Sequence, residues 1–117
     1  IVYDMIASGQ SMLDVAEQLK ERGAKNIYLI ASFALFSDGK KSLDAFNEAH
    51  KRNIFTKCYS SNLSYVPEDV KKQEWFHLAD CSKYLSKLIN ALNNHESISS
   101  LLNSKEKVLE KISKLKK

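Results

Sequence analysis

The sequence begins Ile1-Val2-Tyr3-Asp4-Met5-Ile6-Ala7-Ser8-Gly9-Gln10-Ser11. This pattern predicts the tail of a strand, a loop of small residues and a helix that starts at Ser11, an arrangement that can bind an anion on free backbone N–H groups. Short side chains at Ser8 and Gly9 leave room for a ligand's oxygens, and the hydroxyls of Ser8 and Ser11 can donate further hydrogen bonds. The same pattern also occurs in folds that bind no ligand, so these residues alone leave both interpretations open.

Asp4 is the only acidic residue in this stretch. We expect it at the carboxyl end of the first strand, where open α/β sheets place the groups that contact ligands. A carboxylate at that place accepts hydrogen bonds from the hydroxyls of a sugar or helps to hold a hydrated metal ion.

The composition is that of a soluble globular domain, with 117 residues, 44% hydrophobic and 27% charged. No apolar run approaches the roughly 18 residues that a membrane span needs. Cys58 and Cys81 lack the spacing of a disulfide framework or of paired metal ligands, so we expect small buried apolar residues and a cytoplasmic location. Because the first residue already belongs to a predicted strand, we expect a C-terminal piece of a longer protein.

The net charge of +4 is concentrated at one end of the chain. Residues 104–117 hold six lysines and two glutamates, which leaves twelve basic and twelve acidic residues in 1–103. A nucleic-acid interface needs basic residues spread over a folded face together with aromatic or polar contacts. The sequence therefore predicts neither a nucleic-acid nor a membrane partner.

Along the chain, apolar periodicity predicts helices and strands in alternation. Ser11 and Asp14 resemble a capping box, and Gly23 falls where a left-handed C-cap ends the first helix. A β-branched and apolar run without strict alternation predicts a second strand covered on both faces. We expect helices at about 12–22, 40–52, 82–93 and from 104 onward, strands at about 26–31, 54–60 and 75–80, and a short helical stretch or turn within 69–74.

This order predicts a mostly parallel sheet flanked by helices, with ligands at the carboxyl ends of the strands. Three loops are expected at that edge: the one after the first strand, Ser32–Gly39 and Ser61–Pro67.

The opening segment resembles the ribose-phosphate loop of the type I phosphoribosyltransferase superfamily, whose pattern is an apolar strand, two Asp, two apolar residues and Asp-Thr-Gly-Gly-Thr. Further stretches resemble the C-terminal half of the ribose-phosphate pyrophosphokinase family, and roughly residues 1–102 are covered. These stretches are Ala16–Ala24, Leu35–Ser37, Ser61–Leu63, Cys81–Lys83 and His95–Leu102. The resemblance implies an α/β three-layer sandwich with a mostly parallel sheet.

That family transfers the β,γ-diphosphoryl group of ATP to ribose 5-phosphate with Mg²⁺, as a homo-oligomer that supplies nucleotide biosynthesis. The resemblance implies that Asp4 holds the ribose hydroxyls and that Ser8, Gly9, Gln10 and Ser11 cradle the 5-phosphate. It assigns no catalytic residue or metal ligand to this segment. The ATP-binding half is expected upstream, so we expect a domain at 1–103 that is inactive alone, followed by a basic helix at 104–117.

Three residues depart from the family pattern. Tyr3 replaces the first Asp of the pair, Ala7 replaces the third acid, and Gln10 replaces the second loop glycine. Each lost acid removes a charged hydrogen-bond partner, at a cost of about 1.5–3 kcal/mol. Two alternatives therefore stay open: a non-catalytic regulatory paralogue of the synthetase, and a phosphoribosyltransferase for a nucleobase.

Overall fold

The computed structural model describes residues 1–115 and contains two compact units, Ile1–Cys81 and the segment from Ser82 onward. The predicted domain boundary between residues 103 and 104 stays a prediction.

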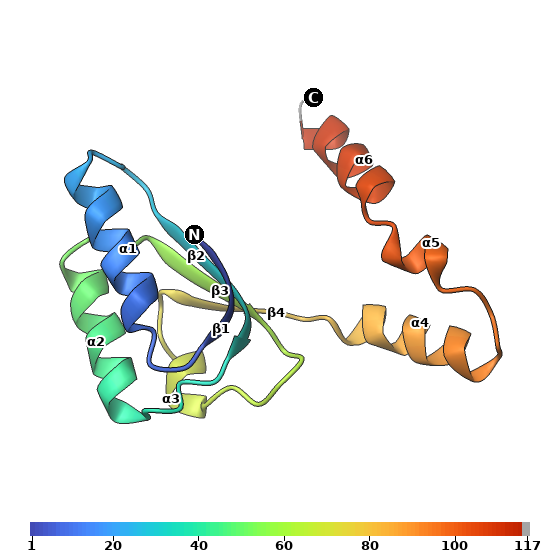
Figure 1. Ribbon diagram of the computed structural model, residues 1–117, viewed down its shortest axis with the longest axis horizontal. Coiled ribbons are helices and arrows are strands. Elements are labelled where there is room, and N and C mark those ends of the chain that lie inside the picture. Colours follow the sequence, from blue (N-terminus) through green and yellow to red (C-terminus); the bar gives the residue numbers. More distant parts are fainter. Residues whose placement is uncertain (116–117) are drawn as a thin grey trace. The chain divides into compact units, whose positions relative to one another are not determined.

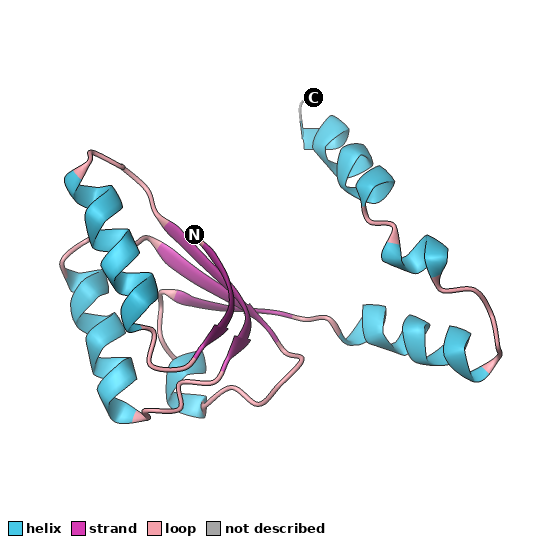
Figure 2. Cartoon of the chain, viewed as in Figure 1, coloured by secondary structure: helices cyan, strands magenta, loops and turns pink. Residues whose placement is uncertain are grey.

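The first unit alternates strands and helices, as expected from the sequence, and its four strands are parallel in the order β1-β2-β3-β4. Figures 1 and 2 show α1 and α2 side by side on one face of this sheet. The predicted α/β class with a mostly parallel sheet is confirmed. The elements are β1 (Val2–Ile6), α1 (Gln10–Glu21), β2 (Tyr28–Ala34), α2 (Lys40–Lys51), β3 (Lys57–Ser61), α3 (Glu68–Lys71) and β4 (Phe76–Ala79).

The sheet of this unit buries one face more deeply than the other. Leu29, Cys58 and Phe76 stand next to one another in the parallel register and are 0–5% exposed. On the opposite face, Tyr28 and Ile30 are 47% and 44% exposed. The prediction that the second strand is covered on both faces is wrong within this unit, because buried and exposed side chains alternate along most of β2.

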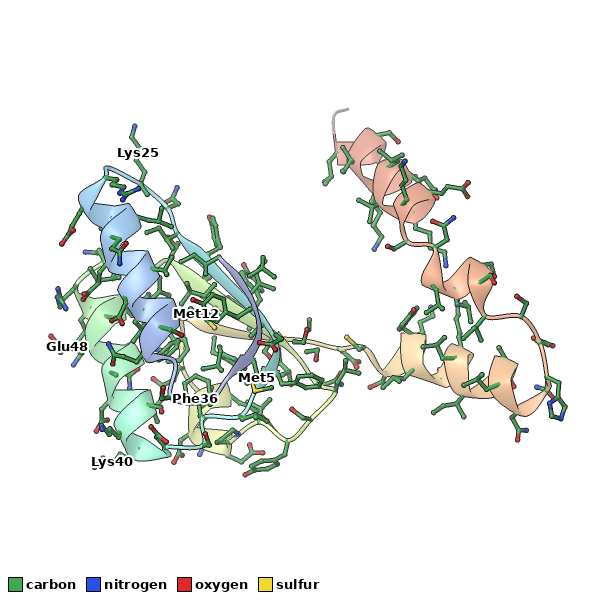
Figure 3. All side chains as sticks on the ribbon, viewed as in Figure 1. Met5, Met12, Lys25, Phe36, Lys40 and Glu48 are labelled. Atoms are coloured by element: carbon green, nitrogen blue, oxygen red, sulfur yellow. The ribbon has the colours of Figure 1, made fainter. Side chains whose placement is uncertain are left out.

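An aromatic cluster fills the space between the helices and the sheet. Phe46 of α2 lies at its centre, with ring centroids 5.1 Å from Phe36, 5.8 Å from Phe55 and 5.5 Å from Trp75. The indole Nε1–H of Trp75 donates to Asn47 Oδ1 at 2.8 Å, which satisfies the polar group of an otherwise buried ring. Phe36, which is labelled in Figure 3, lies in the loop after β2 and is 2% exposed.

Several predicted boundaries move by a few residues. The strand β2 continues to Ala34, and β3 begins at Lys57 rather than near Ile54. The predicted end of α1 is confirmed: Gly23 has φ +90°, and the N–H of Ala24 donates to the Leu19 carbonyl at 3.0 Å. This is the hydrogen-bond pattern of an α-helix that ends at a glycine in the left-handed conformation.

The second unit contains α4 (Ser82–Asn93), α5 (Ser99–Leu102) and α6 (Lys105–Leu115). The bounds of α4 agree with the prediction, and its tyrosine Tyr84 donates to the Leu101 carbonyl at 3.2 Å. Lys116 and Lys117 of the predicted basic helix lie outside the described residues. Within residues 1–115, no helix combines the length and the apolar character that crossing a membrane requires.

Candidate functional site

The candidate site is the loop between β1 and α1, which consists of Ala7, Ser8 and Gly9. Helix α1 begins at Gln10, and Gly9 is its N-cap, with φ +78° and no capping side chain. The predicted capping box at Ser11 and Asp14 is wrong, because glycine turns the chain into the helix earlier. The Asp14 Oδ1 instead accepts a hydrogen bond from Gln10 Nε2 at 2.7 Å.

Gly9 is buried against α2, and its lack of a side chain is essential to the contact. A Cβ atom there would lie 2.2 Å from Cε2 and 2.7 Å from Cζ of Phe46. Real carbon atoms do not approach so closely. The loop therefore owes its shape to the aromatic cluster beneath it as well as to its own sequence.

A second contact joins the loop to the same helix. Ser42 of α2 is 2% exposed, and its hydroxyl donates to the Ala7 carbonyl at 3.5 Å. The backbone N–H groups of Leu35 and Phe36 both donate to the Ile6 carbonyl at 3.0 Å. The ends of β1 and β2 thus meet, which confirms that the first two predicted loops share one edge of the sheet.

A small open cavity of about 260 Å³ lies where the loop faces the first turns of α2. Its walls come from two segments that are about thirty residues apart in the sequence. It is lined by Ser8, Gln10, Asp38, Lys41, Ser42 and Ala45. Ser8 and Gln10 were expected from the sequence as site residues. Of the second segment, only Asp38 lies in a loop, Ser32–Gly39, that was expected at this edge.

The other predicted site residues lie outside this lining. Asp4 sits in the middle of β1 rather than at its end, and its Oδ1 accepts from the backbone N–H of Met5 at 2.8 Å. Ser11 is exposed in the first turn of α1, where its carbonyl accepts a hydrogen bond from the Tyr3 hydroxyl at 3.4 Å. The structure therefore brings Ser8 and Gln10 together at one cavity, with Gly9 buried beside Phe46.

The missed residues carried a weak signal in the sequence. Ser37-Asp38-Gly39 closes the loop after the second strand, and this loop was predicted to lie at the ligand edge, although none of its side chains was predicted as a site residue. Which side chains of α2 turn toward the first loop depends on helix packing, which the local pattern does not encode.

The described residues offer no ready metal site. Within residues 1–115, no three His, Cys, Asp or Glu side chains gather in a way that could hold a metal ion. His77 stacks on Tyr59 with ring centroids 5.3 Å apart, and His50 Nδ1 lies 3.8 Å from Glu74 Oε1. The side chains of residues 1–115 thus do not by themselves provide a cluster that fits a bound Mg²⁺ ion.

Comparisons with known proteins agree on one family. The sequence model of the phosphoribosyl synthetase-associated domain matches residues 1–103. The ribose-phosphate pyrophosphokinase of Mycoplasmopsis pulmonis is 31% identical over 101 residues, which cover 86% of this chain and 30% of that protein. The enzyme of the same name from Vibrio parahaemolyticus is 36% identical over 103 residues, which cover 88% of this chain and 31% of that protein.

The fold is also found among solved structures. The crystal structure of phosphoribosylpyrophosphate synthetase from Mycobacterium smegmatis matches with a TM-score of 0.65 and 21% identity, covering 80% of this chain and 29% of that chain. This likeness shows a shared fold. The chain spans roughly three tenths of the length of these relatives.

Proposed function

Because the chain belongs to the family of the phosphoribosyl synthetase-associated domain, we propose that it is the C-terminal domain of a ribose-phosphate pyrophosphokinase. The longer protein is a transferase that makes phosphoribosyl pyrophosphate from ribose 5-phosphate and ATP for nucleotide biosynthesis. This chain supplies the sugar-phosphate loop, the ATP-binding half lies upstream, and the isolated piece is inactive. The domain comprises residues 1–103, where the family match ends. The lysine-rich segment 104–117 follows, with the helix α6 (Lys105–Leu115) in its described part.

The loop at Ser8 and Gly9 is the observation that carries this proposal. Its shape is fixed by Phe46 and Ser42, and it leads directly into the first turn of α1. That turn has backbone N–H groups without acceptors inside the helix, and such groups bind phosphate oxygens. Since diphosphoryl transfer depends mainly on positioning and charge neutralisation, a rigid phosphate cradle is a suitable contribution.

We assign the ribose hydroxyls to Asp4 and the 5-phosphate to Ser8, Gly9, Gln10 and Ser11. One carboxylate oxygen of Asp4 is occupied by the Met5 N–H, so the other is the acceptor for a sugar hydroxyl. The side-chain amide of Gln10 donates one hydrogen to Asp14, and the backbone N–H of Gln10 donates to the Ser8 hydroxyl oxygen at 3.4 Å. Gln10 therefore contributes through the second hydrogen of its side-chain amide.

The remaining components belong to the longer protein in our proposal. Mg²⁺ is required there and is held chiefly by substrate phosphates, which is its usual mode in phosphate chemistry. The protein acts in the cytoplasm as a homo-oligomer, and its substrates are ribose 5-phosphate and ATP.

Binding of ribose 5-phosphate to the 117-residue chain tests the proposal. Backbone amide shifts measured during a titration to millimolar concentration are expected to concentrate at residues 8–11. Ribose without the phosphate is the matched control and is expected to leave these amides unmoved. A chain that responds to neither compound contradicts the proposed sugar-phosphate site.

A non-catalytic regulatory paralogue is the second candidate, and one contact favours it. Tyr3 stands where the family has an acid, and its ring reaches across the loop so that its hydroxyl bonds the Ser11 carbonyl. That ring stands in place of a carboxylate which would accept a sugar hydroxyl. An assay of the longer protein for phosphoribosyl pyrophosphate formation separates the two, because sustained turnover eliminates the regulatory candidate.

A further inference from the structure

The cavity beside the sugar-phosphate loop has features that the loop motif does not explain. Its volume is about 260 Å³, below the roughly 300–1,000 Å³ of pockets for drug-sized ligands. Five of its six lining residues carry a polar side chain, the exception being Ala45. A small, polar molecule is therefore the occupant that fits.

Lys41 is the single cation in this lining. Within residues 1–115 its ammonium group has no hydrogen bond or ion pair with another residue, whereas Lys71 and Lys114 pair with carboxylates. An ammonium group without a protein partner is available to an anion. Its strongest partner chemistry is a phosphate or carboxylate oxygen, through charge-assisted hydrogen bonds.

The position of Lys41 relative to the loop is fixed by its neighbours on α2. Ser42 follows it directly and bonds the Ala7 carbonyl, and Phe46 lies one turn further on and contacts Gly9. Both contacts involve side chains that are at most 2% exposed. The helix therefore holds the backbone of Lys41 beside the loop without any need for a ligand.

Asp38 decides which kind of anion suits the cavity. It lines the same space, and its negative charge disfavours a bare phosphate ion. A carboxylate also accepts hydrogen bonds from hydroxyl groups, with room for several on its two oxygens. A phosphate ester that carries hydroxyls satisfies both charged residues at once, because its phosphate faces Lys41 and a hydroxyl faces Asp38.

Resting on the proposed function, we infer that Lys41 and Asp38 complete the sugar-phosphate site. Lys41 is the cation for the phosphate, and Asp38 is an acceptor for a sugar hydroxyl, in addition to the loop itself. Asp38 supplies, from the turn before α2, a carboxylate of the kind that the loop lacks at Tyr3 and Ala7. Nothing in the loop motif assigns either residue.

The test compares two adjacent lysines. Lys41→Gln removes the charge from the cavity, whereas Lys40→Gln removes an equal charge from the residue before it. Lys40 begins α2, as Figure 3 shows, and lines a different cavity with Leu43 and Pro67. Both lysines are exposed, so neither change is expected to alter the fold, which a circular dichroism spectrum checks.

Dissociation constants for ribose 5-phosphate and for inorganic phosphate are measured with each variant by amide shifts. Lys41→Gln is expected to weaken both ligands about tenfold, the value of one charge-assisted hydrogen bond, while Lys40→Gln changes either by less than about twofold. Asp38→Asn is expected to weaken ribose 5-phosphate and to strengthen inorganic phosphate. This opposite response is specific to a carboxylate that faces a hydroxyl.

The possible results distinguish a failure of this inference from a failure of the proposed function on which it rests. If the unaltered chain binds ribose 5-phosphate and Lys41→Gln behaves like Lys40→Gln, the role of Lys41 is refuted and the loop assignment stands. If Asp38→Asn shifts both ligands in the same direction, the role of Asp38 is refuted. If the unaltered chain binds no sugar phosphate, the proposed function fails and this inference fails with it.

Discussion

Replacing Gly9 with alanine tests whether the aromatic cluster shapes the loop. The new Cβ would lie 2.2 Å from Cε2 of Phe46, so the ring or the loop must move. Overpacking of this kind costs about 1–3 kcal/mol. The backbone at φ +78° adds about 1–2 kcal/mol for any residue with a Cβ. We expect Gly9→Ala to lower the free energy of unfolding by about 2–5 kcal/mol.

Gly23→Ala is the matched control for the backbone contribution. Gly23 has φ +90°, and no atom lies within 4 Å of the place its Cβ would take. Its replacement is expected to cost only the strain of the left-handed conformation, about 1–2 kcal/mol. The difference between the two variants therefore measures the contact with Phe46.

The assay is urea unfolding followed by tryptophan fluorescence. Trp75 is the only tryptophan, is 1% exposed and lies 5.5 Å from Phe46, so its emission reports the unit that contains the loop. Equal losses for Gly9→Ala and Gly23→Ala would refute the reasoning. The combination of Gly9→Ala with Phe46→Leu is expected to cost less than the sum of the two single changes, because the smaller side chain leaves room for the Cβ.

Three further outcomes are expected. Asn47→Ala leaves the buried indole N–H of Trp75 without its acceptor and should lower the free energy of unfolding by about 1–3 kcal/mol, measured by the same urea titration. Burial raises the pKa of the Cys58 thiol to about 12, so the thiol ionises at a lower pH in the unfolded chain than in the folded one. The stability that the buried neutral thiol contributes is therefore complete below about pH 8.5 and is lost as the pH rises toward 12. Between about pH 8 and pH 10.5, the free energy of unfolding measured in urea should fall less in Cys58→Ala than in the unaltered chain. Iodoacetamide at about pH 8 should label the half-buried Cys81 before the buried Cys58, and equal labelling rates in the folded chain, measured by peptide mass spectrometry, would contradict the buried position of Cys58.

The sequence predicted the features that depend on local pattern. The apolar stripe that starts at Ser82 gave the bounds of α4, and Gly23 marked the end of α1 through its backbone freedom. Alternation of apolar runs with helical periods was enough for the parallel α/β class, because few other topologies connect such elements.

The features that it missed depend on contacts between distant residues. Gly9 rather than Ser11 is the N-cap of α1, and Phe46, thirty-seven positions later, leaves no room for a side chain at that position. Lys41 reaches the candidate site through the packing of α2 against the loop, and no spacing rule within one segment reveals such an approach. The side chains of β2 alternate between a buried and an exposed face, although its apolar composition resembles that of a strand covered on both.

The contact between Gly9 and Phe46 also has an evolutionary consequence. Two positions that share one volume cannot drift independently, so a lineage that places a larger residue at position 9 is expected to place a smaller one at position 46. The same constraint applies to protein engineering. A loop of this shape can be grafted onto another α/β scaffold only together with the part of the neighbouring helix that covers it, and the transferable unit is the pair of segments rather than the loop.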